Sequence, residues 1–436
     1  MNKENKHTMT DLYQMQSLPL SAKIKMTARR ITEWVDRFGE DGVYVSFSGG
    51  KDSTVLVDIV RNVCKYKDIP LVFVDVPTQY PELKEFAETF DNLVFLYPEF
   101  SPAQVCEKYG FPLISKEVAN CVSGARKYVK YLDSQKSDNT ILTDRQTDRQ
   151  TVPYACYMAD LLGIDRRINK QNEQYKSLQM GVIPSGSEYR LRRLNGELTD
   201  SKGNYSQFNQ EKYKFFLDAP FEISDLCCDI MKKKPAHDYE KETGRKPIIA
   251  TMASESIMRT QKWLQDGCNA FNVTRPHSNP MSFWTEQDVL LYIKENAKRM
   301  IEFRMGNDKM FYGNRIVYKS TGANVENNEF YFPICSVYGE VVTDYEAMGQ
   351  CENQMSFADL GIFDAERPVL KTTGCSRTGC VLCGFGCHLE KESRFLRLKE
   401  THPKFHNLLY VLKNNGVTYA QAIDWINEHG GFDIKY

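Results

Sequence analysis

The sequence predicts an α/β protein with a doubly wound, mainly parallel sheet and a helical, cysteine-rich C-terminal module. Three observations support this fold class. Apolar strand patterns alternate with helical patterns in the N-terminal part of the chain, as in βαβ units. A glycine turn joins the first of these strands directly to a helix. Closely spaced cysteines stand late in the chain, outside the alternating pattern.

The N-terminal elements follow one another in a regular order. Residues 21–39, "SAKIKMTARRITEWVDRFG", have apolar positions at near-helical spacing and a final glycine, so they predict a helix. The elements expected after it are the strand "VYVSFS" (43–48), the helix "DSTVLVDIVRNVCKY" (52–66), the strand "PLVFVDV" (70–76), the helix "PELKEFAETF" (81–90) and the strand "NLVFLYP" (92–98). Strands and helices that alternate at this spacing predict a parallel sheet.

The later part of the chain is less regular. Residues of about 130–210 are polar and turn-rich, which indicates an insertion between core elements. A buried strand is expected in "RKPIIATMA" (245–253), and a helix in "SFWTEQDVLLYIKENAKRM" (282–300) with Thr285 as N-cap and Asp288 at N3. The predicted organisation is a polar segment 1–20, a nucleotide-binding domain 21–300 and a C-terminal module 301–436, which ends in helices within 392–415 and 418–429.

Composition limits the classes of function. The 436 residues are 42% hydrophobic and 26% charged, with a net charge of -1, so no basic coat for nucleic acid or membrane covers the whole protein. The N-terminus lacks the apolar region of a signal peptide, and no run reaches the ~18 apolar residues of a membrane span. We therefore expect a cytoplasmic protein with no membrane partner.

The string "SGGKDS" stands between the first predicted strand and its helix. Glycines allow a tight turn whose N–H groups approach an anion, and the helix offers its positive end to the same anion. The predicted phosphate-binding residues are Ser48, Gly49, Gly50, Lys51, Asp52 and Ser53. The spacing differs from that of the Walker A loop.

Five stretches in order resemble the phosphoadenosine phosphosulfate (PAPS) reductase family, which belongs to the PP-loop ATP pyrophosphatases. They are "SGGKDS", "FVDVPTQYPELKEF", "CCDIMKKKP", "ATMASESIMR" and "NPMSFWTEQDVLLYI". The resemblance implies a fold of the adenine nucleotide alpha hydrolase type and a nucleotide ligand, ATP or a sulfonucleotide. It adds Ser46, Asp75 and Lys234 to the nucleotide site, with Asp75 near the nucleoside, and it implies catalytic roles for Lys51, Asp52 and Arg259.

Thirteen cysteines are many for a cytoplasmic chain, so metal or redox chemistry is expected before disulfides. "CSRTGCVLCGFGC" has the spacing C-x4-C-x2-C-x3-C, and an adjacent pair stands at Cys227 and Cys228. Thiolates at C-x2-C spacing can reach one zinc ion or one iron–sulfur cluster. Cys64, Cys106, Cys121, Cys156, Cys335 and Cys351 are interpreted as structural residues instead.

A second resemblance bears on the metal. Sulfonucleotide reductases hold a 4Fe-4S cluster with an adjacent cysteine pair and a later C-x2-C, and the iron–sulfur ATPases of DNA phosphorothioation carry a cysteine-ligated cluster behind the PP-loop domain. The resemblance implies a 4Fe-4S cluster, with Zn²⁺ as the alternative. The candidate ligands are Cys380 and Cys383, with the others drawn from Cys228, Cys375, Cys387 and Cys268; the sequence does not choose among these.

Three kinds of function are compatible with these features. The first is an ATP pyrophosphatase that uses Mg²⁺, adenylates an acceptor, releases pyrophosphate and AMP, and serves sulfur insertion into nucleic acid. The second is a PAPS or adenylylsulfate reductase that releases sulfite; the tail cysteine motif of those reductases is absent, since the chain ends "NEHGGFDIKY". The third is a non-catalytic nucleotide-binding regulator.

A nucleic-acid acceptor would need a local basic path. "GARKYVKY", "DRRINKQ" and "EYRLRRLN" supply cations, with Tyr128, Tyr131, Tyr175 and Tyr189 placed between them for base stacking. Acidic residues are mixed among these cations, so a merely solvated surface is the other interpretation. A sulfur donor or partner protein is expected for sulfur insertion, and the sequence identifies neither.

Overall fold

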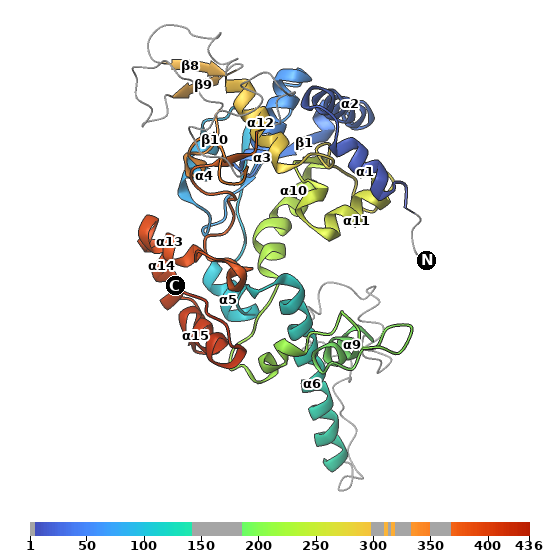
Figure 1. Ribbon diagram of the computed structural model, residues 1–436, viewed down its shortest axis with the longest axis vertical. Helices are drawn as coiled ribbons and strands as arrows, with labels where there is room; N and C mark the ends of the chain where they lie inside the picture. Colours follow the sequence, from blue (N-terminus) through green and yellow to red (C-terminus); the bar gives the residue numbers. More distant parts are fainter. Residues whose placement is uncertain (1–4, 142–184, 298–308, 313–314, 319–332, 349–367) are drawn as a thin grey trace. The chain divides into compact units, whose positions relative to one another are not determined.

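The chain divides into two compact units, each built from separate stretches of sequence. The computed structural model describes residues 5–141, 185–297, 309–312, 315–318, 333–348 and 368–436 (Figure 1). Unit 1 comprises Met1–Glu99 and Lys232–Cys380, and unit 2 comprises Phe100–Met231 and Val381–Tyr436. The predicted domain boundary after residue 300 lies outside the described residues, so it stays a prediction. Most of the predicted insertion, residues 142–184, also lies outside them.

Unit 1 is built around a six-stranded sheet with the order β3-β2-β1-β5-β7-β6. The strands are β1 Val43–Ser46, β2 Leu71–Val74, β3 Leu93–Leu96, β5 Lys246–Ile249, β6 Asn269–Ala270 and β7 His277–Ser278. All neighbouring pairs are parallel except β6 with β7. The mainly parallel α/β fold predicted from the sequence is therefore confirmed. Because β2 and β5 flank β1 on opposite sides, the strand order reverses beside β1.

Helices cover the sheet and bury its apolar side chains. They are α1 Met9–Gln16, α2 Leu20–Phe38, α3 Lys51–Asp58 with a π turn Ile59–Val63, α4 Pro81–Glu88, α10 Lys234–Thr243, α11 Ile257–Asp266 and α12 Glu286–Ala297. Val43 and Val45 of β1 are fully buried. Strands covered on both faces read as continuous apolar runs rather than alternating ones, which is why "VYV" and "LVFV" are almost entirely hydrophobic.

Helix α2 has the boundaries that the sequence predicts within one residue, because Gly39 adopts a φ of 78° and ends it. At the start of α12, Thr285 Oγ1 accepts a hydrogen bond from the N–H of Asp288, and the N–H of Thr285 donates to Asp288 Oδ2. The predicted N-cap is thus confirmed. The same carboxylate pairs with Lys23 of α2 at 2.6 Å, with both side chains buried.

Removing Lys23 should destabilise unit 1 strongly. Lys23→Ala leaves the Asp288 carboxylate buried without its cation, and such a change costs about 3–5 kcal/mol of the free energy of unfolding. Chemical denaturation would measure it. Lys25→Ala, an exposed position of the same helix, is the matched control and should change little. Equal losses for the two variants would contradict the role assigned to this ion pair.

The C-terminal stretch of unit 1 forms two small antiparallel pairs. These are β8 Lys309–Tyr312 with β9 Arg315–Tyr318, and β10 Val341–Thr343 with β11 Leu370–Thr372. The side-chain amide of Gln287 on α12 exchanges two hydrogen bonds with Leu370, at 2.8 and 2.9 Å. These bonds fasten β11 to the start of α12. Part of the predicted C-terminal module therefore belongs to the same compact unit as β1 and the glycine turn.

Unit 2 is mainly helical. Its helices are α5 Pro102–Tyr109, α6 Lys116–Ile141, α9 Ser185–Leu194, α13 Arg394–Thr401, α14 Pro403–His406 and α15 Tyr419–Gly430, and its short strand pairs are β4 Leu113–Ile114 with β12 Gly384–Phe385 and β13 Lys413–Asn414 with β14 Val417–Thr418. Phe215, Phe221 and Trp425 pack ring against ring. The helical C-terminal region is thus present, although Pro403 and the β13–β14 hairpin divide it into shorter helices than the sequence predicts.

Two helices occupy the described part of the predicted insertion. Helix α6 extends into it and packs against α9. A Cβ atom at Gly124 of α6 would lie 2.3 Å from the Arg190 side chain of α9, so the glycine permits the close approach. The sequence around α9 is dominated by polar residues, and its Leu194 is nevertheless fully buried by tertiary packing. None of the helices in the described part of the chain has the length and apolar character needed to span a bilayer.

Candidate functional site

A cavity of about 400 Å³ opens in unit 1 where β1 and β5 end. Its lining consists of Ser48, Gly50, Lys51 and Asp52 from the glycine turn, Met252, Ser254 and Glu255 after β5, Thr285, Glu286 and Gln287 at the start of α12, and Tyr338, Arg377 and Thr378 from the C-terminal stretch. Ligands of doubly wound sheets bind at the carboxyl ends of strands where the strand order reverses. The position of the cavity therefore identifies it as the candidate ligand site.

The glycine turn is held in shape by its own polar groups. Gly49 has a φ of 71°, and a Cβ atom there would lie 3.0 Å from the Leu83 carbonyl oxygen. Both the left-handed backbone conformation and the lack of space therefore disfavour a side chain at this position. The N–H of Gly50 donates to Ser48 Oγ at 3.3 Å. Ser53 Oγ donates to the Gly50 carbonyl at 2.9 Å and accepts from the N–H of Ser48. Ser48 and Ser53 thus preform a backbone turn at the N-terminus of α3.

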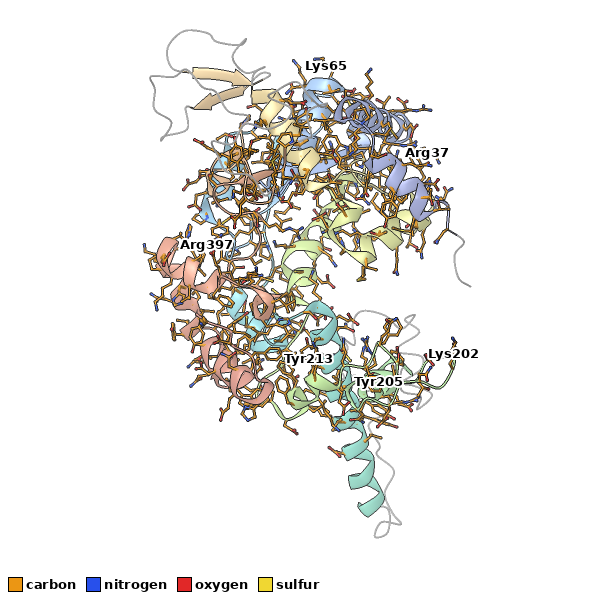
Figure 2. The ribbon with its side chains drawn as sticks, in the orientation of Figure 1. Arg37, Lys65, Lys202, Tyr205, Tyr213 and Arg397 are labelled. Atoms are coloured by element: carbon orange, nitrogen blue, oxygen red, sulfur yellow. The ribbon has the colours of Figure 1, made fainter. Side chains whose placement is uncertain are left out.

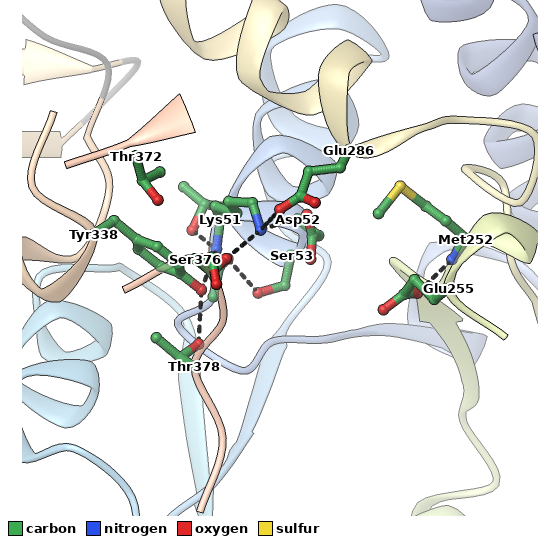
Figure 3. A network of polar contacts seen from close by, with 12 residues as sticks. Lys51, Asp52, Ser53, Met252, Glu255, Glu286, Tyr338, Thr372, Ser376 and Thr378 are labelled. Atoms are coloured by element: carbon green, nitrogen blue, oxygen red, sulfur yellow. Dashed lines mark hydrogen bonds and ion pairs between the residues drawn. The ribbon is translucent and has the colours of Figure 1, made fainter. Parts of the chain in front are cut away.

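Lys51 is buried in this cavity and held by several groups. Its ammonium donates to the carbonyl oxygen of Ser376 at 2.9 Å and pairs with Glu286 Oε1 at 3.1 Å (Figure 3). Its backbone N–H donates to the Tyr338 hydroxyl at 3.2 Å, and its ammonium lies 5.5 Å from the centre of that ring. The groups predicted to bind phosphate are therefore engaged here by other parts of unit 1.

Tyr338 closes one side of the turn. Its hydroxyl lies 2.7 Å from Thr378 Oγ1, and the side chain is almost fully buried. Burial raises the pKa of Tyr338 to about 12, against the lowering effect of the hydrogen bonds from Thr378 and the N–H of Lys51. The phenol is thus neutral at physiological pH, and its oxygen can accept from the N–H that would otherwise face an anion.

Asp52 carries an uncompensated carboxylate oxygen. Oδ1 is buried and accepts no hydrogen bond from the described residues, and the nearest cation, Lys51 Nζ, lies 3.8 Å away. Burial raises the pKa of Asp52; the charges of Lys51 and Arg377 oppose this, and the carboxylates of Glu255 and Glu286 add to it. A group with a raised pKa and no hydrogen-bond partner indicates a functional rather than a stabilising position.

Asp52→Asn should stabilise the protein at neutral pH in the absence of ligands. A carboxyl whose folded-state pKa is raised stabilises the fold most when protonated, and that contribution is lost as the pH rises through the raised pKa. The variant should therefore unfold at a higher temperature at neutral pH, with the difference vanishing below the ordinary carboxyl pKa. Thermal unfolding across pH measures this, with exposed Asp36→Asn as the control. A difference independent of pH would contradict it.

Six residues predicted for nucleotide binding or catalysis lie in unit 1 but do not line the cavity. Asp75 follows β2 and pairs with Lys84 at 2.7 Å. Arg259 forms an ion pair with Glu255, one helical turn before it. Lys234 pairs with Glu99 at 2.7 Å, with half of its side chain exposed. The other three are Ser46, the last residue of β1, and Gly49 and Ser53 of the glycine turn.

Nine of the residues that line the cavity were not predicted as site residues. These are Met252, Ser254, Glu255, Thr285, Glu286, Gln287, Tyr338, Arg377 and Thr378. Glu255 and Glu286 lie within "SESIMR" and "WTEQD", which belong to two of the stretches that resemble the PAPS reductase family. Their place in those stretches could have identified them as candidate site residues. Tyr338 and Arg377 are far from the glycine turn in sequence and have no motif around them that predicts this contact.

The five predicted cluster ligands are divided between the units. Cys375 and Cys380 belong to unit 1, where the Cys375 N–H donates to the Val337 carbonyl at 2.8 Å and Cys380 forms an isolated β-bridge with Gln79. Cys228, Cys383 and Cys387 belong to unit 2. None of the cysteines that the structure describes forms a disulfide. Cys156 and Cys351 lie outside the described residues, and Cys268 is buried in unit 1.

Several thiols of unit 2 surround the buried Tyr419. Its hydroxyl donates to the Leu382 carbonyl at 2.9 Å. Burial raises the pKa of Tyr419 well above its ordinary value, and the thiols of Cys387, Cys383, Cys106 and Cys227 add to the effect. Among the residues that the structure describes, no three His, Cys, Asp or Glu side chains gather closely enough to hold a metal ion. The cluster and its ligand set stay a prediction.

Some cationic side chains of the predicted basic path are engaged in contacts within unit 2. Arg126 donates to the Ala219 carbonyl at 2.8 Å, and Arg193 donates to the Phe208 carbonyl at 2.9 Å and pairs with Glu117. Exposed aromatic side chains of unit 2 include Tyr189, Tyr205 and Phe208, and Figure 2 shows Tyr205 beside the loop that carries Lys202. The rings of Tyr128 and Tyr131 stack with their centres 6.3 Å apart. Tyr175 and "DRRINKQ" lie outside the described residues.

Comparison with known proteins bears on the stretch from β1 through α5. No curated protein matches the chain at a significant level. The stretch from β1 through α5, which contains the glycine turn, matches a family model. Residues 42–111 match the phosphoadenosine phosphosulfate reductase domain, which supports an enzyme with a PP-loop, nucleotide-binding function of the sulfonucleotide-related type.

Proposed function

We propose that this protein is a PP-loop ATP pyrophosphatase that adenylates an acceptor and releases pyrophosphate and AMP. The observation that carries the proposal is the cavity at the ends of β1 and β5, into which the preformed glycine turn places Lys51 and the positive end of α3. An ammonium and oriented backbone N–H groups favour a polyphosphate in that position. Attack of an acceptor oxygen on the α phosphorus would leave the acceptor adenylated and expel pyrophosphate.

The carboxylates of the cavity fit Mg²⁺, which we propose as the partner of the triphosphate. Asp52, Glu255 and Glu286 line the cavity, and the buried Oδ1 of Asp52 has no hydrogen bond to a described residue. Mg²⁺ binds carboxylate oxygens and phosphates together. The bound ion would neutralise charge on the phosphates, while Lys51, relieved of Glu286, would turn its ammonium toward the leaving pyrophosphate.

We further propose a 4Fe-4S cluster, with Zn²⁺ as the alternative, held by ligands from among Cys228, Cys375, Cys380, Cys383 and Cys387. The donor chemistry fits, since none of these cysteines forms a disulfide and Cys380 and Cys383 have thiolate-ligand spacing. Arg394 also donates a hydrogen bond to the Cys383 carbonyl at 2.7 Å, placing a cation beside the predicted thiolates. A bound cluster would supply electron transfer or sulfur handling for the insertion of sulfur.

Nucleic acid is the proposed acceptor. The exposed rings of Tyr189, Tyr205 and Phe208 give unit 2 stacking surfaces of the kind that bind unpaired bases. Lys202, in the turn beside Tyr205, supplies a cation for the backbone. A sulfur donor or partner protein completes the reaction that we propose.

A sulfonucleotide reductase is the second candidate, favoured by the match of residues 42–111. Such a reaction needs a nucleophilic thiolate at the sulfur atom of the nucleotide. The Cys387 side chain is buried, so it is poorly placed to attack a ligand. Cys375, whose thiol lies 3.8 Å from the Tyr80 hydroxyl in unit 1, is the better candidate for the attacking group.

Product analysis tests the two candidates directly. Anaerobic protein is incubated with Mg-ATP in one vessel and with PAPS in another, and pyrophosphate, AMP and sulfite are measured. Equal amounts of pyrophosphate and AMP from ATP, increased by single-stranded nucleic acid, would support the first candidate. Sulfite from PAPS would establish the second instead. Binding without any product would show that the protein is a regulator and overturn both.

A further inference from the structure

The segment between Cys375 and Cys380 is fixed against unit 1 at both ends. The N–H of Gly374 donates to the Tyr338 carbonyl at 2.9 Å, next to the bond from Cys375 to Val337. A Cβ atom at Gly374 would lie 2.4 Å from the Val337 carbonyl oxygen, so this approach requires glycine. At the other end, Cys380 bridges to Gln79. The segment is therefore placed by tertiary contacts rather than by its own sequence.

The middle of this segment reaches the glycine turn. The Ser376 carbonyl accepts from the Lys51 ammonium, and Thr378 Oγ1 contacts the Tyr338 hydroxyl that accepts from the Lys51 N–H (Figure 3). Both chain neighbours of Arg377 thus belong to the network around Lys51. Arg377 itself lines the same cavity.

Arg377 differs from Lys51 in acting on its surroundings through its charge alone, which lowers the pKa of Asp52. It makes no hydrogen bond or ion pair with a described residue, and its side chain is exposed. The positive charge of Lys51 is already matched by Glu286 at 3.1 Å. The cavity lining therefore includes an exposed guanidinium that makes no hydrogen bond or ion pair with a described residue, whereas the charge of Lys51 is paired. Its N–H groups are available to a ligand.

We infer that Arg377 binds the phosphate chain of the ligand, so that the cysteine-bearing segment contributes a binding residue to the nucleotide site. A guanidinium presents parallel N–H groups that match two phosphate oxygens, whereas an ammonium acts as a point charge. The ligand class is a nucleotide with an anionic chain beyond its first phosphorus or at its sulfate end, as in ATP or PAPS. The inference rests on the proposed function for the existence of that ligand.

Binding measurements with Arg377→Ala test the inference. Calorimetry would give the dissociation constants of the full chain for ATP, PAPS, pyrophosphate and adenosine. Loss of charge-assisted hydrogen bonds should weaken ATP binding by about 10- to 100-fold, with adenosine unchanged. Arg377→Lys should recover part of the loss. Lys371→Ala, an exposed cation of β11 that pairs with Asp344 and lies outside the cavity lining, is the matched control and should bind like the wild type.

Each outcome of these binding measurements either supports or overturns the role inferred for Arg377. A variant that binds ATP, PAPS and pyrophosphate as the wild type does would overturn the inference and leave the proposed function standing. An equal loss for adenosine would also overturn it, because the effect would then be structural. A loss confined to PAPS would support Arg377 as an anion contact and remove ATP as the ligand. If the wild-type protein binds none of the three anions, both the inference about Arg377 and the proposed function would be overturned.

Discussion

Replacing Lys51 with methionine is expected to lower the rate of pyrophosphate release from Mg-ATP by about 10²- to 10³-fold, the usual loss when a charge-stabilising donor is removed from an active site. The ammonium is the one side-chain cation that the glycine turn places in the cavity, among the described residues. Methionine keeps the length and apolar stem of the lysine, so it preserves packing against Tyr338. Steady-state product assays measure the effect, and circular dichroism checks the fold.

The control for Lys51→Met is Lys241→Ala, an exposed lysine of α10 that lies outside the cavity. This variant should keep wild-type rates. Pyrophosphate release by Lys51→Met within threefold of the wild-type rate would contradict the assignment of the turn as the phosphate site. Loss of iron or zinc from the same variant would instead mean that Lys51 supports the metal centre as well as the nucleotide.

Replacing Cys383 with serine is expected to remove most of the visible absorbance and bound iron of anaerobically purified protein, while ATP affinity stays within about twofold. Serine is a poor ligand for a 4Fe-4S cluster, which needs thiolates. Cys383 belongs to unit 2, whereas the cavity belongs to unit 1, so a direct effect on the nucleotide is not expected. Iron and zinc analysis together with absorption spectra measures the loss.

Cys64→Ser is the matched control for Cys383→Ser, because Cys64 is a partly buried thiol outside the predicted ligand set. It should keep full metal content. Metal retained by Cys383→Ser would contradict a centre at the C-x2-C pair. Comparing Cys227→Ser with Cys228→Ser then identifies the ligand in the adjacent pair. The sequence favours Cys228, but Cys227 is the one whose thiol acts on Tyr419 together with Cys383 and Cys387.

The sequence by itself determined the elements whose formation depends on near neighbours. Alternating apolar strands and helices specified the parallel sheet of unit 1, since each element shows its period within a few turns of chain. The string "SGGKDS" specified the turn for the same reason: Gly49 takes the left-handed conformation and Ser53 bonds back to Gly50 within that stretch. The N-cap at Thr285 was predictable for the same reason, because its hydrogen bonds join residues only three positions apart.

Only the tertiary structure decided which groups share the cavity and which cations are already paired. Tyr338, Ser376 and Arg377 reach the glycine turn from far along the chain, and no local period encodes contacts between residues so distant in sequence. The sequence likewise supplied Lys234 as a cation for the nucleotide, while Glu99 pairs with it. A charge is visible in the sequence, but the partner that neutralises it depends on the packing of the folded chain.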